Sequence, residues 1–423
     1  MSDLAAKSDL DYDVAIIGAG MVGATLASLL SRCGFAVALV EAHEPQPFDA
    51  NAEVGLRVSA ISPGSSAVLE QAGAWKAVSA QRARPYRRMQ IEDGVEMDPL
   101  LFDAPVFNME RLGTIVENAL LQWSLWQVVK SGGLVDVYCP EQLDSIGFSK
   151  NRNRVSLKSG RIITASLVVG ADGAGSRVRK AIGIRQDYYA YNQHGLVAVV
   201  GKHKPNPGVA WQRFLPGGPL AFLPLADGRS SIVWTRPSLE AERLLALETT
   251  DFIGELDTAS SGWLGKVESC GPRAAFPLSM RLSECYASQR TLLMGDAAHV
   301  VHPLAGQGVN LGLTDAAALT ELLIRVRLAG GDIGSAMVLQ DYGRGRRSES
   351  EAMAFGMHAL RSLFGIEGLS PVRRAGMALV KRSWTIKDIF LQRAAGTANN
   401  APKLARGATL RDLTGGLSRS AYG

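Results

Sequence analysis

The hydrophobic positions near the start of the chain form two short continuous runs, separated by a glycine-rich turn and an amphipathic stretch. Residues 12–17 (YDVAII) and 35–41 (FAVALVE) are rich in β-branched and other apolar side chains. Such unbroken runs are typical of strands in a parallel sheet, which are buried on both faces. The stretch between them continues to Cys33 and stops at Gly34, so the pattern predicts a strand–helix–strand unit.

Helical and extended periodicities alternate through the next part of the chain. Apolar residues recur at helical spacing over residues 115–130, and residues 86–92 alternate like a half-buried strand. Pro63 and Gly64 open another apolar stretch, which predicts a helix over 63–80. Short strands are expected near 134–138, 153–158 and 161–170.

Residues 186–287 have a different pattern, in which prolines, glycines and aromatic residues separate short extended runs. The runs 221–225 (AFLPL) and 230–235 (SSIVWT) are typical of antiparallel strands. We therefore expect a separate antiparallel sheet with one helix near 238–257. The pattern then returns to strand, turn and helix, and residues 335–395 are expected to be mostly helical.

The composition is that of a folded protein with more than one domain. The chain has 423 residues, of which 47% are hydrophobic and 20% charged, so it can bury a sizeable core. The polar, acidic start lacks the basic and apolar segments of a secretion signal, and glycine and arginine interrupt the apolar region 14–40 too often for a membrane span. We expect a cytoplasmic protein. The four cysteines are scattered, form no CxxC pair and are expected to be reduced: Cys33, Cys139, Cys270 and Cys285.

Positive charge is concentrated towards the C-terminal end. The chain carries a formal net charge of +5, and from Pro371 onward the only acidic residues are Asp388 and Asp412. A basic segment can bind nucleic acid, anionic lipid or a protein partner. Because no nucleic-acid-binding motif accompanies it, no nucleic-acid partner is expected. The basic residues are Arg373, Arg374, Lys381, Arg382, Lys387, Arg393, Lys403, Arg406, Arg411 and Arg419.

A glycine motif lies at the turn of the first strand–helix–strand unit. Gly18, Gly20 and Gly23 form GxGxxG between a strand and a helix, and Glu41 ends the next strand. The first glycine permits the tight turn, the second lets a diphosphate approach the backbone, and the third lets helix and strand pack closely. An acid at position 41 can accept hydrogen bonds from ribose hydroxyls and disfavours a 2′-phosphate. The motif predicts FAD or NAD rather than NADP; the alternative is a glycine-rich turn without a ligand.

A second motif, LVVGADGAGSRVRK (167–180), ends a strand and begins a helix near Ser176. Asp172, which stands between small residues and is followed by Gly173, can reach a ligand without steric conflict. The alternative is an ordinary strand–helix turn in which Ser176 caps the helix, and these residues taken alone slightly favour it.

The third motif, TLLMGDAAHVVHPLAGQGVNLGLTDAAAL (291–319), is the most informative segment. Gly295 and Asp296 follow a buried strand and present a carboxylate that can hydrogen-bond a polyol hydroxyl. Pro303 stiffens the loop that follows. A glycine-rich turn then opens a helix whose free amides can hold an anion or an electron-rich ring edge. That turn contains Gly306, Gly308, Val309 and Asn310.

Two histidines in the third motif, His299 and His302, are three residues apart and could suggest a metal site. No third ligand is nearby, so no metal is predicted. We expect His299 to be a packing residue and His302 to be a loop residue.

With the three motifs in this order, the sequence resembles the class A flavoprotein aromatic hydroxylases, the para-hydroxybenzoate hydroxylase-like family. The resemblance covers about residues 12–395. Within the family, the chain is most similar to the ubiquinone-biosynthesis hydroxylases, and among these to the 3-demethoxyubiquinol 3-hydroxylase branch. The segments that carry the similarity are RVSAISPGS (57–65), YRRMQI (86–91), VENALLQWSLWQ (116–127) and GDAAHVVHPLAGQGVNLG (295–312).

The resemblance implies an α/β (α+β) fold, in which a Rossmann-like FAD-binding domain carries an inserted antiparallel-sheet substrate domain and a helical C-terminus. We place the first part of the FAD-binding domain at 8–185, with an excursion towards the substrate side near 85–110. The other predicted ranges are 186–288 for the substrate domain, 289–335 for the second part of the FAD-binding domain, and 336–423 for the C-terminal region.

The family also implies roles for the motif residues. The ADP half of FAD would be held by Gly18, Gly20, Gly23 and Glu41, with Arg57 near the diphosphate. Asp172 and Gly173 would serve FAD and passing NAD(P)H. The ribityl chain would be contacted by Gly295, Asp296 and Asn118, and the isoalloxazine by Pro303, Gly306, Gly308, Val309 and Asn310.

The activity implied by the resemblance is hydroxylation of the aromatic ring of a polyprenyl phenol or quinol. NAD(P)H would reduce FAD without a second Rossmann domain, reduced flavin would react with O2 to give a C4a-hydroperoxide, and the electron-rich ring would attack its distal oxygen. Water must be kept from the site. No general base is predicted. Four aromatic residues either line the substrate pocket or form the core of the inserted sheet: Trp211, Phe214, Phe222 and Trp234.

Other functions remain open on the sequence alone. A related hydroxylase could act on another ring position or another phenol, and a reductase or halogenase could share the fold, although no tryptophan here lies in the WxWxIP motif of halogenases. A non-catalytic scaffold would not need the intact glycines or Asp172 and Asp296. The choice between NADH and NADPH and the oligomeric state, a homo-oligomer included, are also open.

The basic segment 370–395 is expected to be a helix, with Ser370 as its N-cap and Pro371 in its first turn. Three environments are compatible with its mixture of apolar and basic residues. It could rest on the inner face of a membrane, contact another enzyme of ubiquinone biosynthesis, or pack on the FAD-binding domain as a terminal helix.

Overall fold

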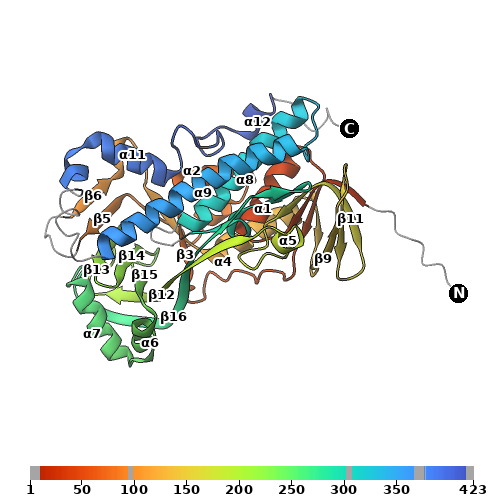
Figure 1. Cartoon of the computed structure of the whole chain (residues 1–423). Helices are drawn as coiled ribbons and strands as arrows, with labels where there is room; N and C mark the ends of the chain where they lie inside the picture. The colour runs from red at the N-terminus through yellow and green to blue at the C-terminus, as the bar shows by residue number, and fades with distance from the viewer. Residues whose placement is uncertain (1–9, 94–98, 302–306, 366–375, 377, 416–423) are drawn as a thin grey trace.

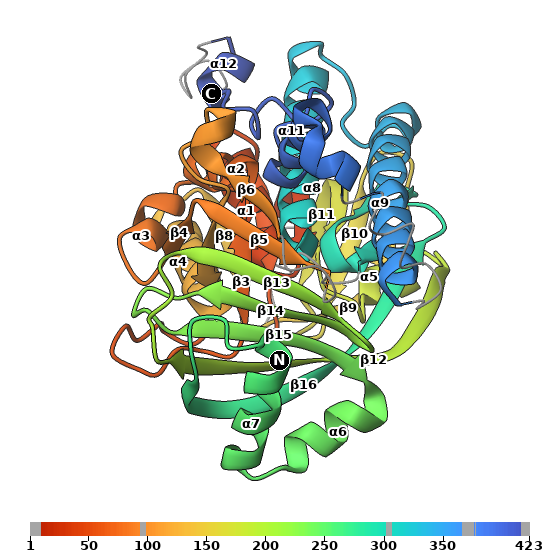
Figure 2. The ribbon, with the colours of Figure 1, turned by 90° about the vertical axis from the view of Figure 1, so that its left-hand side faces the viewer.

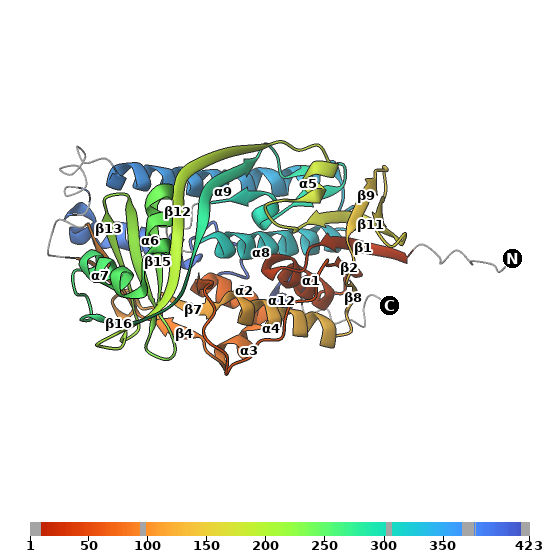
Figure 3. The same ribbon diagram turned by 90° about the horizontal axis from the view of Figure 1, so that it is seen from below.

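The computed structural model describes residues 10–93, 99–301, 307–365, 376 and 378–415 (Figure 1). These residues form two sheets of eight strands and one of three. Helices α8 and α9 run along the molecule beside both large sheets, while α6 and α7 cover the far side of the second large sheet (Figures 1 and 3). The mixed α/β fold expected from the sequence is confirmed.

The first large sheet has the order β17-β18-β11-β1-β2-β8, and its five strands from β18 to β8 are parallel. Its central residues, such as Val14, Ile16 and Leu39, are fully buried because helices pack on the sheet. The strand–helix–strand unit is confirmed. The elements are β1 (Leu10–Ile17), α1 (Met21–Arg32), β2 (Val37–Val40), α4 (Asn118–Ser131), β8 (Val135–Tyr138), β9 (Leu143–Gly147), β10 (Asn153–Leu157), β11 (Ile162–Gly170), α5 (Arg177–Ala181), β17 (Ala287–Ser288), β18 (Thr291–Leu293) and α8 (Gln307–Leu328).

The second large sheet has the order β19-β16-β12-β15-β14-β13-β5-β6, and every pair is antiparallel except β13–β5. The 17-residue strands β12 and β16 extend from this sheet towards α5 and the first sheet (Figure 3). The elements are β5 (Arg88–Glu92), β6 (Leu100–Asp103), β12 (Gln186–Lys202), β13 (Val209–Leu215), β14 (Gly218–Pro224), β15 (Ser230–Pro237), α6 (Ser238–Ala246), α7 (Thr249–Ser260), β16 (Val267–Ser283), η2 (Gly295–Ala297) and β19 (His299–Val300).

Two predicted helices are divided in the structure, and a third begins later than predicted. The region 63–80 forms α2 (Pro63–Ala72) and α3 (Trp75–Ser79), because Gly73 ends α2 in the left-handed conformation at φ +84°. The region 238–257 is broken where Leu247 and Glu248 are extended. The first residues of 115–130 belong to strand β7 (Gly113–Glu117), whose β-branched side chains are buried between β3 (Val58–Ile61) and β4 (Arg84–Tyr86).

The C-terminal part contains α9 (Ala336–Gly365), α11 (Trp384–Ala395) and α12 (Leu410–Leu413). Of the predicted helix over 370–395, residues 378–382 are helical, and Ser383 then interrupts it and caps α11 by accepting a hydrogen bond from the amide of Ile386. The predicted start at Ser370 and Pro371 lies outside the described residues. α11 lies near β6 and α2 through Leu391 and Gly396, whereas α12 lies at a separate place (Figures 1 and 2).

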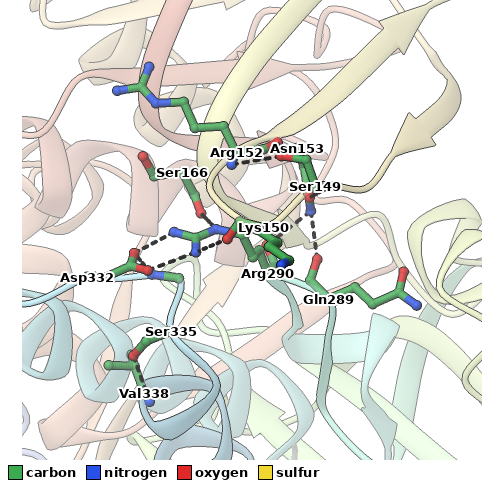
Figure 4. A network of polar contacts seen from close by, with 11 residues as sticks. Ser149, Lys150, Arg152, Asn153, Ser166, Gln289, Arg290, Asp332, Ser335 and Val338 are labelled. Carbon is green, nitrogen blue, oxygen red and sulfur yellow. Dashed lines mark hydrogen bonds and ion pairs between the residues drawn. The ribbon is translucent and has the colours of Figure 1, made fainter.

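Arg290 fixes the position of β18 against the neighbouring strands (Figure 4). Its guanidinium donates to the carbonyls of Ser166 and Lys150, both at 2.9 Å, and pairs with Asp332 just before α9. Asn153 donates to the carbonyl of Gln289 at 2.7 Å. These contacts hold β18 beside β11, so the ends of the two strands, Gly170 and Leu293, are paired.

No helix within the described ranges is long and apolar enough to cross a membrane. Cys33, Cys139, Cys270 and Cys285 are all free, as expected.

Candidate functional site

Two adjoining cavities run along the carboxyl edge of the parallel sheet and share Gly20, Ala171 and Gly173. The first, of about 460 Å³, extends past Glu41. The second, of about 470 Å³, extends to the inner face of the antiparallel sheet. The carboxyl edge of a parallel sheet is the usual ligand-binding edge of such folds, because strand ends and helix N-termini meet there.

The first glycine motif lies where the cavities join. Gly18 has φ +104°, and a Cβ atom on it would lie 2.5 Å from the carbonyl oxygen of Ala171. A Cβ on Gly23 would lie 2.0 Å from the Gly18 oxygen, so this glycine serves the packing of α1 and does not line a cavity. Gly20, by contrast, has no atom within 4 Å of its Cβ position. The first amides of α1 are therefore open to the cavities and can bind an anion.

Glu41 lines the far end of the first cavity. One of its carboxylate oxygens accepts a 2.6 Å hydrogen bond from the amide of Ala19, and the other accepts a 3.1 Å bond from the amide of His43. These bonds fix the carboxylate immediately after β2, beside the glycine turn. A fixed carboxylate can accept further hydrogen bonds from hydroxyls, because each oxygen has two lone pairs.

Asp172 takes part in a helix cap and also lines a cavity, which are the two alternatives that the sequence left open for its turn. Its carboxylate accepts hydrogen bonds from the Ser176 hydroxyl at 2.6 Å and from the amides of Arg177 and Val178 at 2.7 and 3.2 Å. Ser176 in turn accepts from the amide of Arg179 and caps α5. The turn is therefore a helix cap, and Asp172 and Gly173 nevertheless line the first cavity.

Asp296 faces the second cavity together with Arg57 and Asn118. The Asp296 side chain is exposed to the cavity but enclosed by protein, and this desolvation raises its pKa against the opposing charges of His299, Arg57 and Arg281. The guanidinium of Arg57 lies over the ring of Phe276, 5.3 Å from its centroid. Asn118 begins α4 and accepts a 2.7 Å bond from the hydroxyl of Ser59.

The start of α8 contributes Gly308 and Val309 to the second cavity. Asn310 does not line it: its side chain accepts from the amide of Ser62 at 2.9 Å and donates to the carbonyl of Ala60 at 2.8 Å. This side chain ties α8 to the junction of β3 and α2, so a ligand could contact only its backbone. Pro303, Gly306 and His302 lie outside the described residues.

A buried polar network lies directly behind the Gly295–Asp296 turn. Nε2 of His299 is 2.6 Å from one oxygen of Asp315, which also accepts from the amide of Gly295 at 2.9 Å. Nε of Arg346 donates to the other oxygen at 2.6 Å. Burial tends to raise the pKa of Asp315, but the charges of His299 and Arg346 outweigh it and lower this pKa to about 2.

This network corrects the expectation that His299 is only a packing residue. Asp315 and Arg346 were not among the residues predicted from the sequence. An acid within the apolar run LGLTDAAAL is nevertheless a signal, since a buried carboxylate needs partners. Among the residues that the structure describes, no group of histidines, cysteines and carboxylates is arranged to hold a metal ion.

The antiparallel sheet forms the outer wall of the second cavity. Gly195 and Val197 of β12, Ser231 and Val233 of β15, and the segment Phe276–Ser279 of β16 line it. Alternate residues of a strand point to opposite faces. The intervening residues therefore belong to the core under α6 and α7: Leu196, Ile232 and Trp234.

Three of the four aromatic residues expected at the pocket or in the sheet lie in the sheet core. Trp211 and Phe222 are 5.4 Å apart, and Trp263 is stacked on Trp211 at 5.2 Å. Together with Trp234 they are buried in the same cluster. Phe214 is partly buried and is not among the residues that line either cavity.

The two cavities fit an extended dinucleotide with a ring system at one end. Bare amides at Gly20 match a diphosphate, the fixed carboxylate of Glu41 matches a ribose at one end, and Asp296 matches a polyol at the other. Glycines keep the path between them free of side chains. FAD has these groups in this order, so the fold and the site are those expected of an FAD-dependent enzyme built on a Rossmann-like domain. The comparisons below show that the class is that of the FAD-dependent monooxygenases.

Comparison with known proteins agrees with this class. Residues 11–354 match the family described as FAD binding domain. The chain is 36% identical to the 3-demethoxyubiquinol 3-hydroxylase of Escherichia coli (strain K12), over 91% of this chain and 98% of that protein. It is 34% identical to the ubiquinone hydroxylase UbiL of Rhodospirillum rubrum, over 96% and 95% of the two chains.

The fold is similar to that of PqsL from Pseudomonas aeruginosa, with a TM-score of 0.71 and 24% identity over 87% of this chain and 99% of that one. The chain belongs to the FAD-binding-domain family and, within it, to the group that contains the ubiquinone hydroxylases.

Proposed function

We propose that the protein hydroxylates the aromatic ring of a polyprenyl phenol or quinol in ubiquinone biosynthesis, using FAD, NAD(P)H and O2. The main support for this proposal is the pair of adjoining cavities. They lead from a site suited to a dinucleotide to an uncharged wall on the antiparallel sheet. The names of the related proteins support the substrate class, and the family supports the cofactor.

For FAD, we propose that the ADP half lies in the first cavity. Glu41 would bind a ribose, and the amides at Gly20 would bind the diphosphate, with Gly18 and Gly23 keeping the turn tight. Arg57 lines the second cavity, as Gly20 does, and forms no ion pair among the described residues, so its guanidinium would offset the diphosphate charge. Asp172 and Gly173 would contact FAD, and they would also contact NAD(P)H when it enters the site to reduce the flavin.

The flavin half would lie in the second cavity. Asp296 and Asn118 would contact the ribityl chain, and the amides at Gly308 and Val309 would contact the ring. Asn310 would contribute through its backbone only, because its side chain is engaged by Ser62 and Ala60. Gly295 allows the turn at φ +54°. The contacts of Pro303 and Gly306 with the ring stay a prediction from the sequence, since both lie outside the described residues.

Bound FAD would supply the electron transfer and oxygen activation that no side chain can provide. The protein would position FAD and the substrate and would exclude water from the reacting atoms. Among the described residues of the sheet wall, the polar side chains are the hydroxyls of Ser231 and Ser279, and none is an acid or a base. This suits an electron-rich phenol or quinol, which needs little help from a general base, and an apolar wall keeps water from the reacting atoms.

Ser231 is the best candidate to orient the substrate ring. Its side chain is 1% exposed, it lines the second cavity, and its hydroxyl has no hydrogen-bond partner in the described structure. A buried hydroxyl without a partner costs free energy, and a ring oxygen of the substrate would remove that cost.

We also propose that the reaction takes place at the cytoplasmic face of a membrane. A polyprenyl chain partitions into lipid, since each buried methylene contributes about 0.8 kcal/mol. The substrate of such an enzyme therefore has to be taken from a bilayer.

The decisive experiment measures NAD(P)H-dependent oxygen consumption by the purified flavoprotein, with and without a soluble demethoxyubiquinol analogue. Substrate-stimulated uptake together with a product that has gained one oxygen atom would support the proposal. Bound FAD with neither result would contradict it and favour a different phenol or a reductase.

A further inference from the structure

An apolar patch surrounds α11 on the surface of the molecule. The described residues of this patch come from β6, from the short helix η1 (Ala104–Phe107) and from the C-terminal helices. Each of its large hydrophobic side chains is more than half exposed: Leu101 53%, Val106 62%, Leu379 59%, Trp384 58%, Ile389 54% and Phe390 52%. We call these six residues the α11 patch.

The patch is held in place by the body of the protein. Leu391 and Ala395, one turn apart on α11, are buried, and Leu391 packs with Leu100 and Phe102 of β6. Trp384 is stacked on Phe107 with ring centroids 5.8 Å apart. The helix is therefore attached through one face, and Ile389 and Phe390 lie on the other. Large side chains gathered on a fixed surface in this way usually mark an interaction site.

The charge on and immediately before α11 is positive. Arg382, Lys387 and Arg393 lie on or next to α11, and the one acid of that helix is Asp388, which accepts a hydrogen bond from Gln392. A second copy of the chain would bring the same basic residues against each other in a two-fold contact, which like charges oppose. An anionic lipid surface supplies both an apolar layer for the patch and negative charge for the basic residues.

We propose that the α11 patch is the surface by which the protein docks on an anionic bilayer, with Ile389 and Phe390 entering the interface and Trp384 at its edge. The sequence left three environments open for this segment. Two of them are compatible with the structure together, since one face of α11 packs on the protein and Ile389 and Phe390, on the other face, are exposed in the described part of the chain. The inference rests on the proposed membrane location, but not on the proposed hydroxylation.

The test is co-sedimentation of the full-length, FAD-loaded protein with vesicles of phosphatidylcholine alone or mixed in equal parts with phosphatidylglycerol. The double variant Ile389→Ser/Phe390→Ser should bind the anionic vesicles roughly tenfold or more weakly than the unmodified chain, because two apolar anchors are lost. The matched control is Leu239→Ser on α6, which removes an 82% exposed side chain across the second large sheet from α11 and should bind normally (Figures 1 and 2).

A second variant tests the charge. Lys387→Gln/Arg393→Gln should weaken binding to the anionic vesicles and leave binding to phosphatidylcholine unchanged. All variants should retain FAD and should turn over a soluble quinol analogue as the unmodified chain does, so loss of docking is distinguishable from loss of the reaction or of the fold. Equal vesicle binding by all variants would overturn the proposal. So would a change in oligomeric state on light scattering for Ile389→Ser/Phe390→Ser, which would assign the patch to a second copy.

Discussion

Nε2 of His299 lies 2.6 Å from Oδ2 of Asp315, and both side chains are almost completely buried. The same carboxylate oxygen accepts the amide of Gly295, so the pair holds the turn that presents Asp296 to the second cavity. Arg346 of α9 completes the network from the other side. The Gly295–Asp296 turn, α8 and α9 are thus joined through the carboxylate of Asp315, which we expect to be a positioning residue.

Asp315→Asn should destabilise the protein by about 3–5 kcal/mol, because it leaves the buried guanidinium of Arg346 without its main counter-charge. Urea unfolding followed by circular dichroism measures this. The control is Asp341→Asn, which removes an exposed ion pair with Arg325 and should cost about 0–1 kcal/mol. A loss of less than about 1 kcal/mol for Asp315→Asn would show that the network is not needed for stability.

The lowered pKa of Asp315 predicts a loss of stability in acid. Its pKa is about 2 in the folded protein, against about 3.9 for an ordinary aspartate in the unfolded chain. Between these values the unfolded state binds more protons, so stability is fully present above about pH 4 and falls as the pH drops towards 2. The free energy of unfolding, measured from pH 5 to pH 2, should fall less steeply for Asp315→Asn than for the unmodified chain.

Gly23→Ala should abolish FAD binding, because the added Cβ would lie 2.0 Å from the carbonyl oxygen of Gly18 and force α1 away from the turn. The FAD content of the purified protein, read from its absorbance, is the measurement. Gly254→Ala in α7 is the control: no atom lies within 4 Å of its Cβ position, and the change should stabilise the helix by up to about 1 kcal/mol. Normal FAD content in Gly23→Ala would contradict the assigned diphosphate site.

Ser231→Ala should raise the KM for a soluble quinol analogue by a few-fold, which corresponds to the loss of one hydrogen bond of about 0.5–1.5 kcal/mol. Steady-state oxygen uptake at varied analogue concentration measures it. FAD content should be unchanged, since Ser231 belongs to the antiparallel sheet and none of the residues assigned to the diphosphate lies on that sheet. If KM and the position of hydroxylation both stay the same, Ser231 does not contact the substrate.

Local patterns in the sequence were sufficient for the elements and motifs of the dinucleotide site. The apolar runs at 12–17 and 35–41 form strands, and Gly18 makes the tight turn that its motif predicts, with a positive φ, because close contacts within a short segment decide both. Glu41 follows its strand as expected. Helix boundaries were less well predicted: Gly73 divides one helix, and residues 113–117 pair as a strand with partners that periodicity cannot show.

The sequence by itself therefore determined the Rossmann-like unit, the three motifs and the family, since each depends on residues that are neighbours in the chain. Only the tertiary structure decided which side chains of those motifs remain available to a ligand. In the folded protein the side chain of Asn310 accepts a hydrogen bond from Ser62. His299, Asp315 and Arg346 come together from three different elements. The tertiary structure also left Ile389 and Phe390 exposed. The physical reason is that burial and hydrogen bonding join residues far apart in the chain, and their spacing in the sequence carries no record of such contacts.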